Sequence, residues 1–141
     1  MSRIYWDSMV FAYWIQSHPV YTKKIEKIVT SMNVRGDTLC TSTFTFGEVL
    51  TGPVKQKDTV LEQLVLDVFS GGDIELIPFR LKTAERFAQI RASLSVKPAD
   101  AIHLAIAAEA AVDVFLTNDS QLIGRVVPGI QFVTGLDTNL F

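Results

Sequence analysis

The chain has 141 residues, and because one domain typically holds about 100–150 residues, we expect residues 1–141 to form a single domain. Its 48% hydrophobic content supplies a core, and its 20% charged content excludes a disordered polyelectrolyte. The formal net charge of −2 excludes a general basic coat for nucleic acid. It does not exclude an enzyme that approaches phosphate through a bound cation.

The sequence predicts a soluble cytoplasmic protein without membrane association. One cysteine, Cys40, excludes an intrachain disulfide, and its place in an apolar segment predicts a small buried side chain. The N-terminus carries no signal-peptide pattern. The longest stretch without a charged residue, Ser8–Thr22, is too short and too polar for a membrane span, which needs about 20 apolar residues.

Expected strands and helices follow one another along the chain. Aromatic and β-branched runs predict the strands, and apolar residues three or four positions apart predict the helices. We expect strands at 3–7, 38–41, 74–77, 114–117 and 131–133. Between the first two strands we expect a helix at 10–15 and a helix from Pro19 to a turn at 35–37, and after the second strand a helix from Phe44 that Gly52-Pro53 ends and a helix at 57–69. Helices at 81–94 and 99–111 follow the third strand, and a short helix near Ser120 follows the fourth.

This alternation predicts an α/β domain with a mostly parallel sheet covered on both faces. In such sheets, functional sites form at the carboxyl ends of the strands. Asp7 and Asp119 each stand at the end of an expected strand. We therefore expect these two acids to belong to a site.

Four acids have a structural explanation when each is taken singly. Asp7 and Asp119 are expected helix N-caps, and Asp100 lies in a first helical turn, where a carboxylate complements the helix dipole. Glu48 follows Thr45 by three residues, so the pair matches a capping box. Such caps are common, and these readings stay open for each acid alone.

Taken together, the four acids predict a metal site, because all of them lie at expected helix starts on one sheet edge. Neighbouring carboxylates raise one another's pKa, and a divalent cation removes that cost. Oxygen ligands favour Mg²⁺, which binds one or two carboxylates and keeps several waters. Two scattered histidines give no zinc spacing. The residues alone leave nuclease, phosphatase and other phosphoryl-transfer chemistry open.

At these acids the sequence resembles a PIN domain, in particular the VapC-type toxins of toxin–antitoxin pairs. The matching segments are residues 4–8 (IYWDS), 46–49 (FGEV), 97–105 (KPADAIHLA) and 115–119 (FLTND). Their order and spacing agree over nearly the whole chain. The resemblance implies a three-layer α/β/α fold and Mg²⁺- or Mn²⁺-dependent cleavage of RNA.

The resemblance also assigns roles to the four acids. It implies that Asp7 and Asp100 are the most direct metal ligands and that Asp119 joins them directly or through water. Glu48 would act through a water or orient one. A proposed mechanism follows, in which a metal-bound water with a lowered pKa attacks an RNA phosphodiester in line.

Four further residues are expected to support the site. The resemblance implies that Ser8, Thr117 and Asn118 hold carboxylates, water or substrate. His103 lies about one helical turn after Asp100 and is in reach of that carboxylate. We expect His103 to be a hydrogen-bonded core or supporting residue rather than a general base.

The expected partners are RNA, a small antitoxin and a second copy of the chain. VapC-type toxins usually form homodimers, and their antitoxins place a tail in the active-site groove. An acidic site does not attract RNA by itself, so basic side chains elsewhere must contact phosphate, or else form ordinary solvated helix faces. The candidates are Lys23, Lys24, Lys27, Arg80, Lys82 and Arg86.

Other readings remain open. A haloacid-dehalogenase-type phosphatase needs a second Asp two residues after Asp7, where Met9 stands. A receiver-type domain needs paired early acids and a late lysine near Asp119, and neither is evident. A metal-dependent nuclease or phosphoesterase without a toxin role, or a non-catalytic PIN-like binding module, would carry the same residues.

Overall fold

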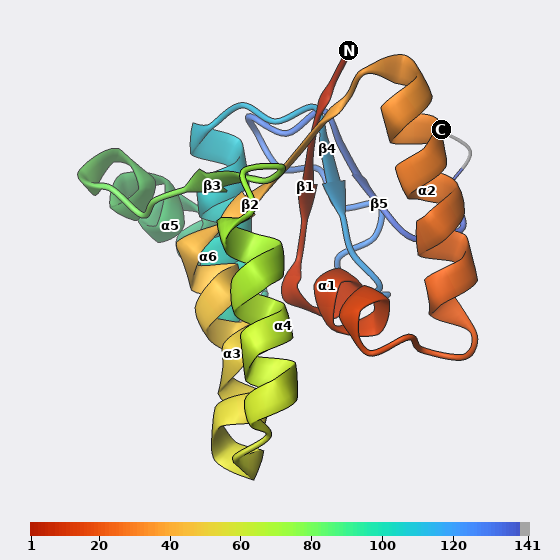
Figure 1. The fold of residues 1–141 in the computed structure, drawn as a ribbon. Helices are drawn as coiled ribbons and strands as arrows, with labels where there is room; N and C mark the ends of the chain where they lie inside the picture. The colour runs from red at the N-terminus through yellow and green to blue at the C-terminus, as the bar shows by residue number, and fades with distance from the viewer. Residues whose placement is uncertain (139–141) are drawn as a thin grey trace.

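A five-stranded sheet forms the centre of the computed structural model, which describes residues 1–138 (Figure 1). Its strands are β1 (Arg3–Trp6), β2 (Thr38–Ser42), β3 (Glu75–Ile77), β4 (Val114–Leu116) and β5 (Phe132–Thr134). Their spatial order is β3-β2-β1-β4-β5, and every neighbouring pair is parallel. The expected parallel α/β sheet is confirmed.

Six helices of the described chain connect and flank these strands. They are α1 (Ser8–Ile15), α2 (Tyr21–Arg35), α3 (Thr43–Gln56), α4 (Thr59–Ser70), α5 (Leu81–Ser93) and α6 (Pro98–Glu109). Helices α3 and α4 run side by side and extend beyond the sheet (Figure 1). Among residues 1–138, none of the helices has the length and apolarity needed to cross a membrane.

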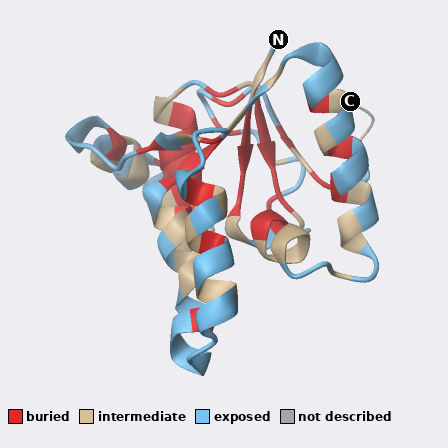
Figure 2. Cartoon of the chain, viewed as in Figure 1, coloured by how far each residue is buried: buried red, intermediate tan, exposed pale blue. Residues whose placement is uncertain are grey.

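Alternating side chains of the strands build a core on each face of the sheet. Ile4 and Trp6 pack into one core, with α1, α2 and α4, whereas Tyr5 packs into the other, with α5 and α6. Cys40 is fully buried beside Tyr5, as expected. Buried residues accordingly lie in the strands and on the inward sides of the helices (Figure 2). The three-layer α/β/α arrangement is confirmed.

Local sequence signals start several of these helices. The Asp7 side chain accepts hydrogen bonds from the backbone of α1, and Ser42 does the same for α3. Asp58 caps α4, and Pro98 opens α6 at a position where its missing N–H costs nothing. The junctions that follow β1 and β2 are thus each capped by a polar side chain at the carboxyl edge of the sheet.

The expected end of one helix and one expected short helix are wrong. Helix α3 continues through Gly52 and Pro53 to Gln56 and ends at Lys57, whose φ is 54°. The main-chain Asp58 N–H then bonds to Pro53 O at 3.0 Å and closes the helix. The expected short helix near Ser120 is instead a run of turns at residues 120–124, since the left-handed Gly124 (φ 82°) stops it.

Candidate active site at the carboxyl edge of the sheet

Asp7 and Thr117 meet because β1 and β4 are neighbours in the sheet. Trp6 is in register with Leu116, so the residues that follow each strand emerge side by side. The Thr117 hydroxyl donates to Asp7 Oδ2 and accepts the backbone N–H of Asp119 at 3.1 Å. A single hydroxyl therefore links the carboxylate of Asp7 to the backbone of Asp119.

The Asp7 carboxylate is buried, with 8% of the residue exposed. Its Oδ1 accepts the backbone N–H groups of Met9 (3.1 Å) and Val10 (3.4 Å), so the expected N-cap is confirmed. Burial raises the pKa of Asp7, and the Thr117 hydrogen bond and the charge of His103 oppose that rise. Within residues 1–138, no lysine or arginine forms an ion pair with this carboxylate.

Asp100 lies in the first turn of α6, as expected, and is half-buried. Burial raises the pKa of its carboxyl, and the negative charges of Asp119 and Glu48 raise it further. The charges of His103 and Lys97 act in the opposite direction. Asp119 and Glu48 therefore both lie close enough to Asp100 to repel its carboxylate.

Glu48 is held by His103 rather than by a helix end. It lies in the second turn of α3, and its Oε1 is 2.5 Å from His103 Nε2. The capping-box reading with Thr45 is wrong, because Ser42 is the N-cap and accepts the Thr45 N–H at 3.0 Å. The expected contact between His103 and Asp100 is replaced by this one with Glu48.

Three buried hydroxyls around His103 were not predicted from the sequence. Its Nδ1 lies 2.8 Å from the Tyr5 hydroxyl and 3.3 Å from Thr45 Oγ1, and Tyr5 in turn donates to Ser42 at 2.9 Å. Burial raises the pKa of the Tyr5 hydroxyl well above its ordinary value. A tyrosine in the middle of a buried strand signals such a network, since its hydroxyl needs a partner.

The remaining two predicted residues, Ser8 and Asn118, lie at the rim. Asn118 Nδ2 donates to the Tyr13 hydroxyl at 3.4 Å, which ties the loop after β4 to α1. Ser8 begins α1 next to Asp7 and is half-buried. Their expected contacts with water or substrate stay predictions.

The family model that matches this chain is that of the PIN domain, over residues 4–126. The chain belongs to the PIN-domain family. Among curated proteins, no sequence matches it.

Several solved structures share the fold of this PIN domain. VapBC2 from Rickettsia felis, bound to a DNA fragment from their promoter, aligns with a TM-score of 0.76 and 18% identity over 94% of this chain and 98% of that one. DNA-bound VapBC from Salmonella typhimurium aligns with a TM-score of 0.67 and 22% sequence identity, and the alignment covers 96% of this chain and 99% of that one. Mycobacterium tuberculosis VapC20, a sarcin–ricin loop cleaving toxin, aligns with a TM-score of 0.66 and 11% sequence identity, and the alignment covers 79% of this chain and 86% of that one.

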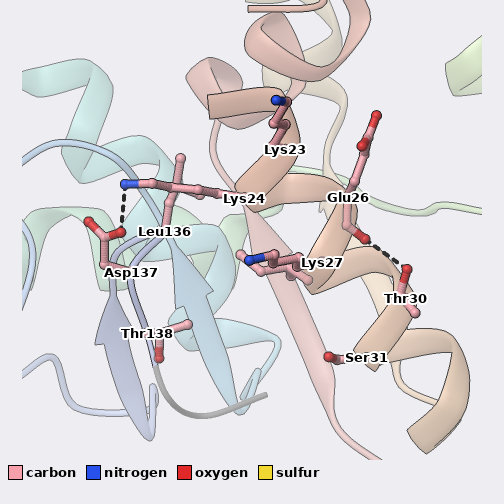
Figure 3. A pocket seen from close by; sticks show the side chains of 10 residues that line it. Lys23, Lys24, Glu26, Lys27, Thr30, Ser31, Leu136, Asp137 and Thr138 are labelled. Carbon is pink, nitrogen blue, oxygen red and sulfur yellow. Dashed lines mark hydrogen bonds and ion pairs between the residues drawn. The ribbon is translucent and has the colours of Figure 1, made fainter. Parts of the chain in front are cut away.

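Basic side chains of α2 line an open groove of about 890 Å³ in this PIN domain (Figure 3). Lys24 is held by Asp137, with Nζ 2.6 Å from Oδ1 (Figure 3). Lys23 and Lys27 are exposed on the same helix. Of the expected phosphate contacts on α2, these two have the charge most accessible to a ligand.

An aromatic cluster connects this groove to the rim of the acidic site. The rings of Tyr13, His18 and Tyr21 lie with centroids 4.6–4.9 Å apart, and Lys24 Nζ lies 5.8 Å from the Tyr21 ring centre. Because Tyr13 also contacts Asn118, aromatic and basic groups extend continuously from the loop after β4 to α2.

The donor set suits a hard divalent cation, although the side chains do not form a ready-made cage. In the described part of the chain, no three His, Cys, Asp or Glu side chains converge as a metal site. The oxygen donors of Asp7, Asp100 and Asp119 nevertheless match Mg²⁺, which needs one or two carboxylates and completes its shell with water. Burial raises the pKa of both Asp7 and Asp100, and at Asp100 the negative charges of Asp119 and Glu48 add to the rise, so a bound cation would favour the charged form of both carboxylates.

Proposed function

We propose that this PIN domain is a Mg²⁺-dependent endoribonuclease, with Mn²⁺ able to substitute, that hydrolyses RNA phosphodiester bonds as the toxin of a toxin–antitoxin pair. The observation that carries the proposal is the acidic edge itself. Thr117 joins the buried Asp7 carboxylate to the backbone N–H of Asp119, and the charges of Asp119 and Glu48 act on the Asp100 carboxyl. Such charge accumulation costs stability and is retained at sites that bind cations.

Asp7, Asp100 and Asp119 would hold the cation. When bound, it would lower the pKa of a water and offset charge on a phosphoryl oxygen. Three hydrogen bonds, from Thr117, Met9 and Val10, already fix both oxygens of the Asp7 carboxylate. Asp7 thus needs little reorganisation to act as a ligand.

Glu48 would orient the attacking water. It is 31% exposed on its side chain and lines a hollow of about 500 Å³, so water reaches it while His103 holds one of its oxygens. The other residues of that hollow are Thr43, Phe44, Gly47, Thr51 and Phe79.

A single-stranded substrate suits the groups beside the acids. Bases of single-stranded RNA stack on aromatic side chains, and phosphates bind lysines. Half-buried Tyr13 contacts Asn118 and lies against Tyr21 at a ring-centroid distance of 4.7 Å, and Lys23 and Lys27 are exposed on the same helix as Tyr21. This arrangement supports RNA contact without a general basic coat.

The toxin role is supported by solved relatives of the same fold, among them VapBC assemblies. The partner would then be a small antitoxin whose tail enters the active-site groove, and the protein would form a homodimer. Co-purification with the product of an adjacent small reading frame, and loss of cleavage in that complex, would support this part. A nuclease without a toxin role is the alternative if no such partner inhibits it.

The test compares cleavage of a labelled single-stranded RNA by wild-type protein, Asp7→Asn, Asp100→Asn and the matched control Asp67→Asn. Asp67 is an exposed residue of α4, so the control makes the same chemical change outside the site. We expect the two site variants to lose activity by a factor on the order of 10²–10⁴, while the control keeps it. EDTA should abolish cleavage, and Mg²⁺ or Mn²⁺ should restore it.

A thermal-shift titration supplies a readout that does not depend on activity. Mn²⁺ should raise the melting temperature of wild-type protein and not that of Asp7→Asn, because a ligand stabilises only the fold that binds it. Full activity of folded Asp7→Asn, with contaminating nuclease excluded, would overturn the proposal. Absence of both cleavage and a Mn²⁺ shift in wild-type protein would favour a non-catalytic binding module.

A further inference from the structure

The hydrogen-bond network around His103 determines which of its ring nitrogens carries a hydrogen. The Tyr5 hydroxyl donates its one hydrogen to Ser42 Oγ at 2.9 Å. The 2.8 Å contact between Tyr5 and His103 Nδ1 must then use a hydrogen on Nδ1. Nδ1 of His103 is therefore a donor.

The surroundings hold the network in this arrangement. Ser42 Oγ also accepts the Thr45 N–H at 3.0 Å, and its own hydrogen has an acceptor in Thr45 Oγ1 at 3.1 Å. The His103 ring is 3% exposed and packs against the rings of Phe44 and Tyr5, at centroid distances of 5.1 and 5.9 Å. Burial and these two ring contacts hold the imidazole in the orientation that directs Nδ1 at Tyr5.

Nε2 is thereby directed at Glu48 alone. A separation of 2.5 Å between Nε2 and Glu48 Oε1 requires one hydrogen between the two atoms. With that hydrogen on Nε2 the pair is an imidazolium and a carboxylate; with it on Oε1 both groups are neutral. The other charged groups that act on this pair are Asp7 and Asp100, whose carboxyls feel the charge of His103.

We propose that His103 is a positioning residue for Glu48: Tyr5 and Ser42 commit its Nδ1 as a donor, so that Nε2 and one shared hydrogen hold the Glu48 carboxylate in place. The role in cleavage rests on the proposed nuclease function, whereas the assignment of the hydrogen does not. The network reaches Glu48 entirely through buried groups, so it orients this acid without contacting substrate.

The first test reads the ring nitrogens directly, by ¹⁵N NMR on metal-free protein. The chain has two histidines, and His18 is an internal comparison because its Nδ1 accepts the N–H groups of Val20 (3.1 Å) and Tyr21 (3.2 Å). We expect a protonated Nδ1 for His103 and an unprotonated Nδ1 for His18 at neutral pH. Tyr5→Phe removes the acceptor of the Nδ1 hydrogen, so we expect His103 in this variant to be a mixture of forms with and without a hydrogen on Nδ1. An unprotonated Nδ1 of His103 in the wild type overturns the proposal.

The second test asks whether His103 acts through Glu48. His103→Asn keeps a donor near Nδ1 only, and His103→Gln places an amide near Nε2. We expect His103→Asn to lower kcat roughly 10- to 100-fold, as loss of such supporting groups does, and His103→Gln to recover part of it. In a Glu48→Gln background, His103→Asn should lower kcat no further.

The outcomes separate the two proposals. Independent, multiplicative losses of kcat in the double variant would show a merely structural His103 and overturn the positioning role. Cleavage that depends on Asp7 but not on His103 overturns this inference and leaves the proposed function standing. If Nδ1 of His103 is protonated but the protein cleaves no RNA, the proposed nuclease function is overturned and the assignment of the hydrogen to Nδ1 stands.

Discussion

Asp7 is both a helix cap and a member of the acidic edge, and these two roles make opposite contributions to stability. As a cap it satisfies the backbone N–H groups of Met9 and Val10. As a buried carboxylate without a cationic side-chain partner in the described chain, it loses hydration. The raised pKa of Asp7 shows that the cost of burial exceeds the gain from its hydrogen bonds.

We expect Asp7→Asn to raise the free energy of unfolding by about 1 kcal/mol at pH 7 in metal-free buffer, since asparagine caps a helix equally well and carries no charge. The folded chain binds more protons than the unfolded chain between the two pKa values of Asp7. Wild-type stability therefore falls as pH rises through that window, and the difference between the proteins vanishes below the ordinary aspartate pKa.

Urea unfolding at several pH values measures this difference. The exposed Asp67→Asn substitution should leave stability nearly unchanged at every pH and serves as the matched control. A less stable Asp7→Asn protein at pH 7 would show that the cap and the Thr117 bond depend on the charge, contrary to the expectation.

Among single residues, the sequence predicted the acids but not their surroundings. Asp7 and Asp119 were proposed because each follows a strand, and Asp100 because it lies in the first turn after Pro98. The hydroxyls of Tyr5, Ser42 and Thr45 were missed, since they contact His103 across 58 to 98 residues or reach it through one another. No local spacing rule connects residues so far apart.

Among the elements, α3 departs most from its expected length. Proline inside a helix removes one backbone hydrogen bond, so Gly52-Pro53 predicts an end. Helix α3 nevertheless runs on to Gln56, because it packs along α4, and its Pro53 is buried. Packing against a neighbouring helix outweighed the local preference, and a sequence window does not contain that neighbour.

The joint between α3 and α4 depends on Asp58, whose Oδ1 accepts the Leu61 N–H at 3.0 Å. We expect Asp58→Ala to cost about 1 kcal/mol of unfolding free energy, as loss of an N-cap does, and Asp58→Asn to cost little. Thermal unfolding followed by circular dichroism would measure both. Equal losses in the two variants would mean that the charge, rather than the cap, stabilises the joint.

For the whole molecule, the sequence predicted a parallel sheet with both faces covered but not the order of its strands. Strand β1 lies in the centre, between β2 and β4, and this order is what brings Asp7 beside Thr117. The residues of β1 do not predict which strands lie beside it, because Ile4, Tyr5 and Trp6 make both faces of the strand apolar. The placement of the acids at expected helix starts predicted one shared sheet edge, and the family resemblance added the role of each acid there.

That residues 1–141 form a single domain stays a prediction, and the two cores offer a test of it. Trp6 and Trp14 report on one face of the sheet by fluorescence, while Cys40 reports on the other by thiol reactivity. Burial raises the pKa of Cys40 to about 12, so we expect the thiol to react only when the fold opens. We expect both probes to give the same urea midpoint. Separate midpoints would indicate two units.

The central place of β1 also has a consequence for biosynthesis. Asp7 is translated 110 residues before Thr117, the residue that orients its carboxylate. Until β4 has left the ribosome, one side of β1 lacks a neighbour and the acidic edge is incomplete. A stalled or prematurely terminated product therefore has the first acid without its partner, and only a ribosome that has read past codon 119 releases a chain with all four acids.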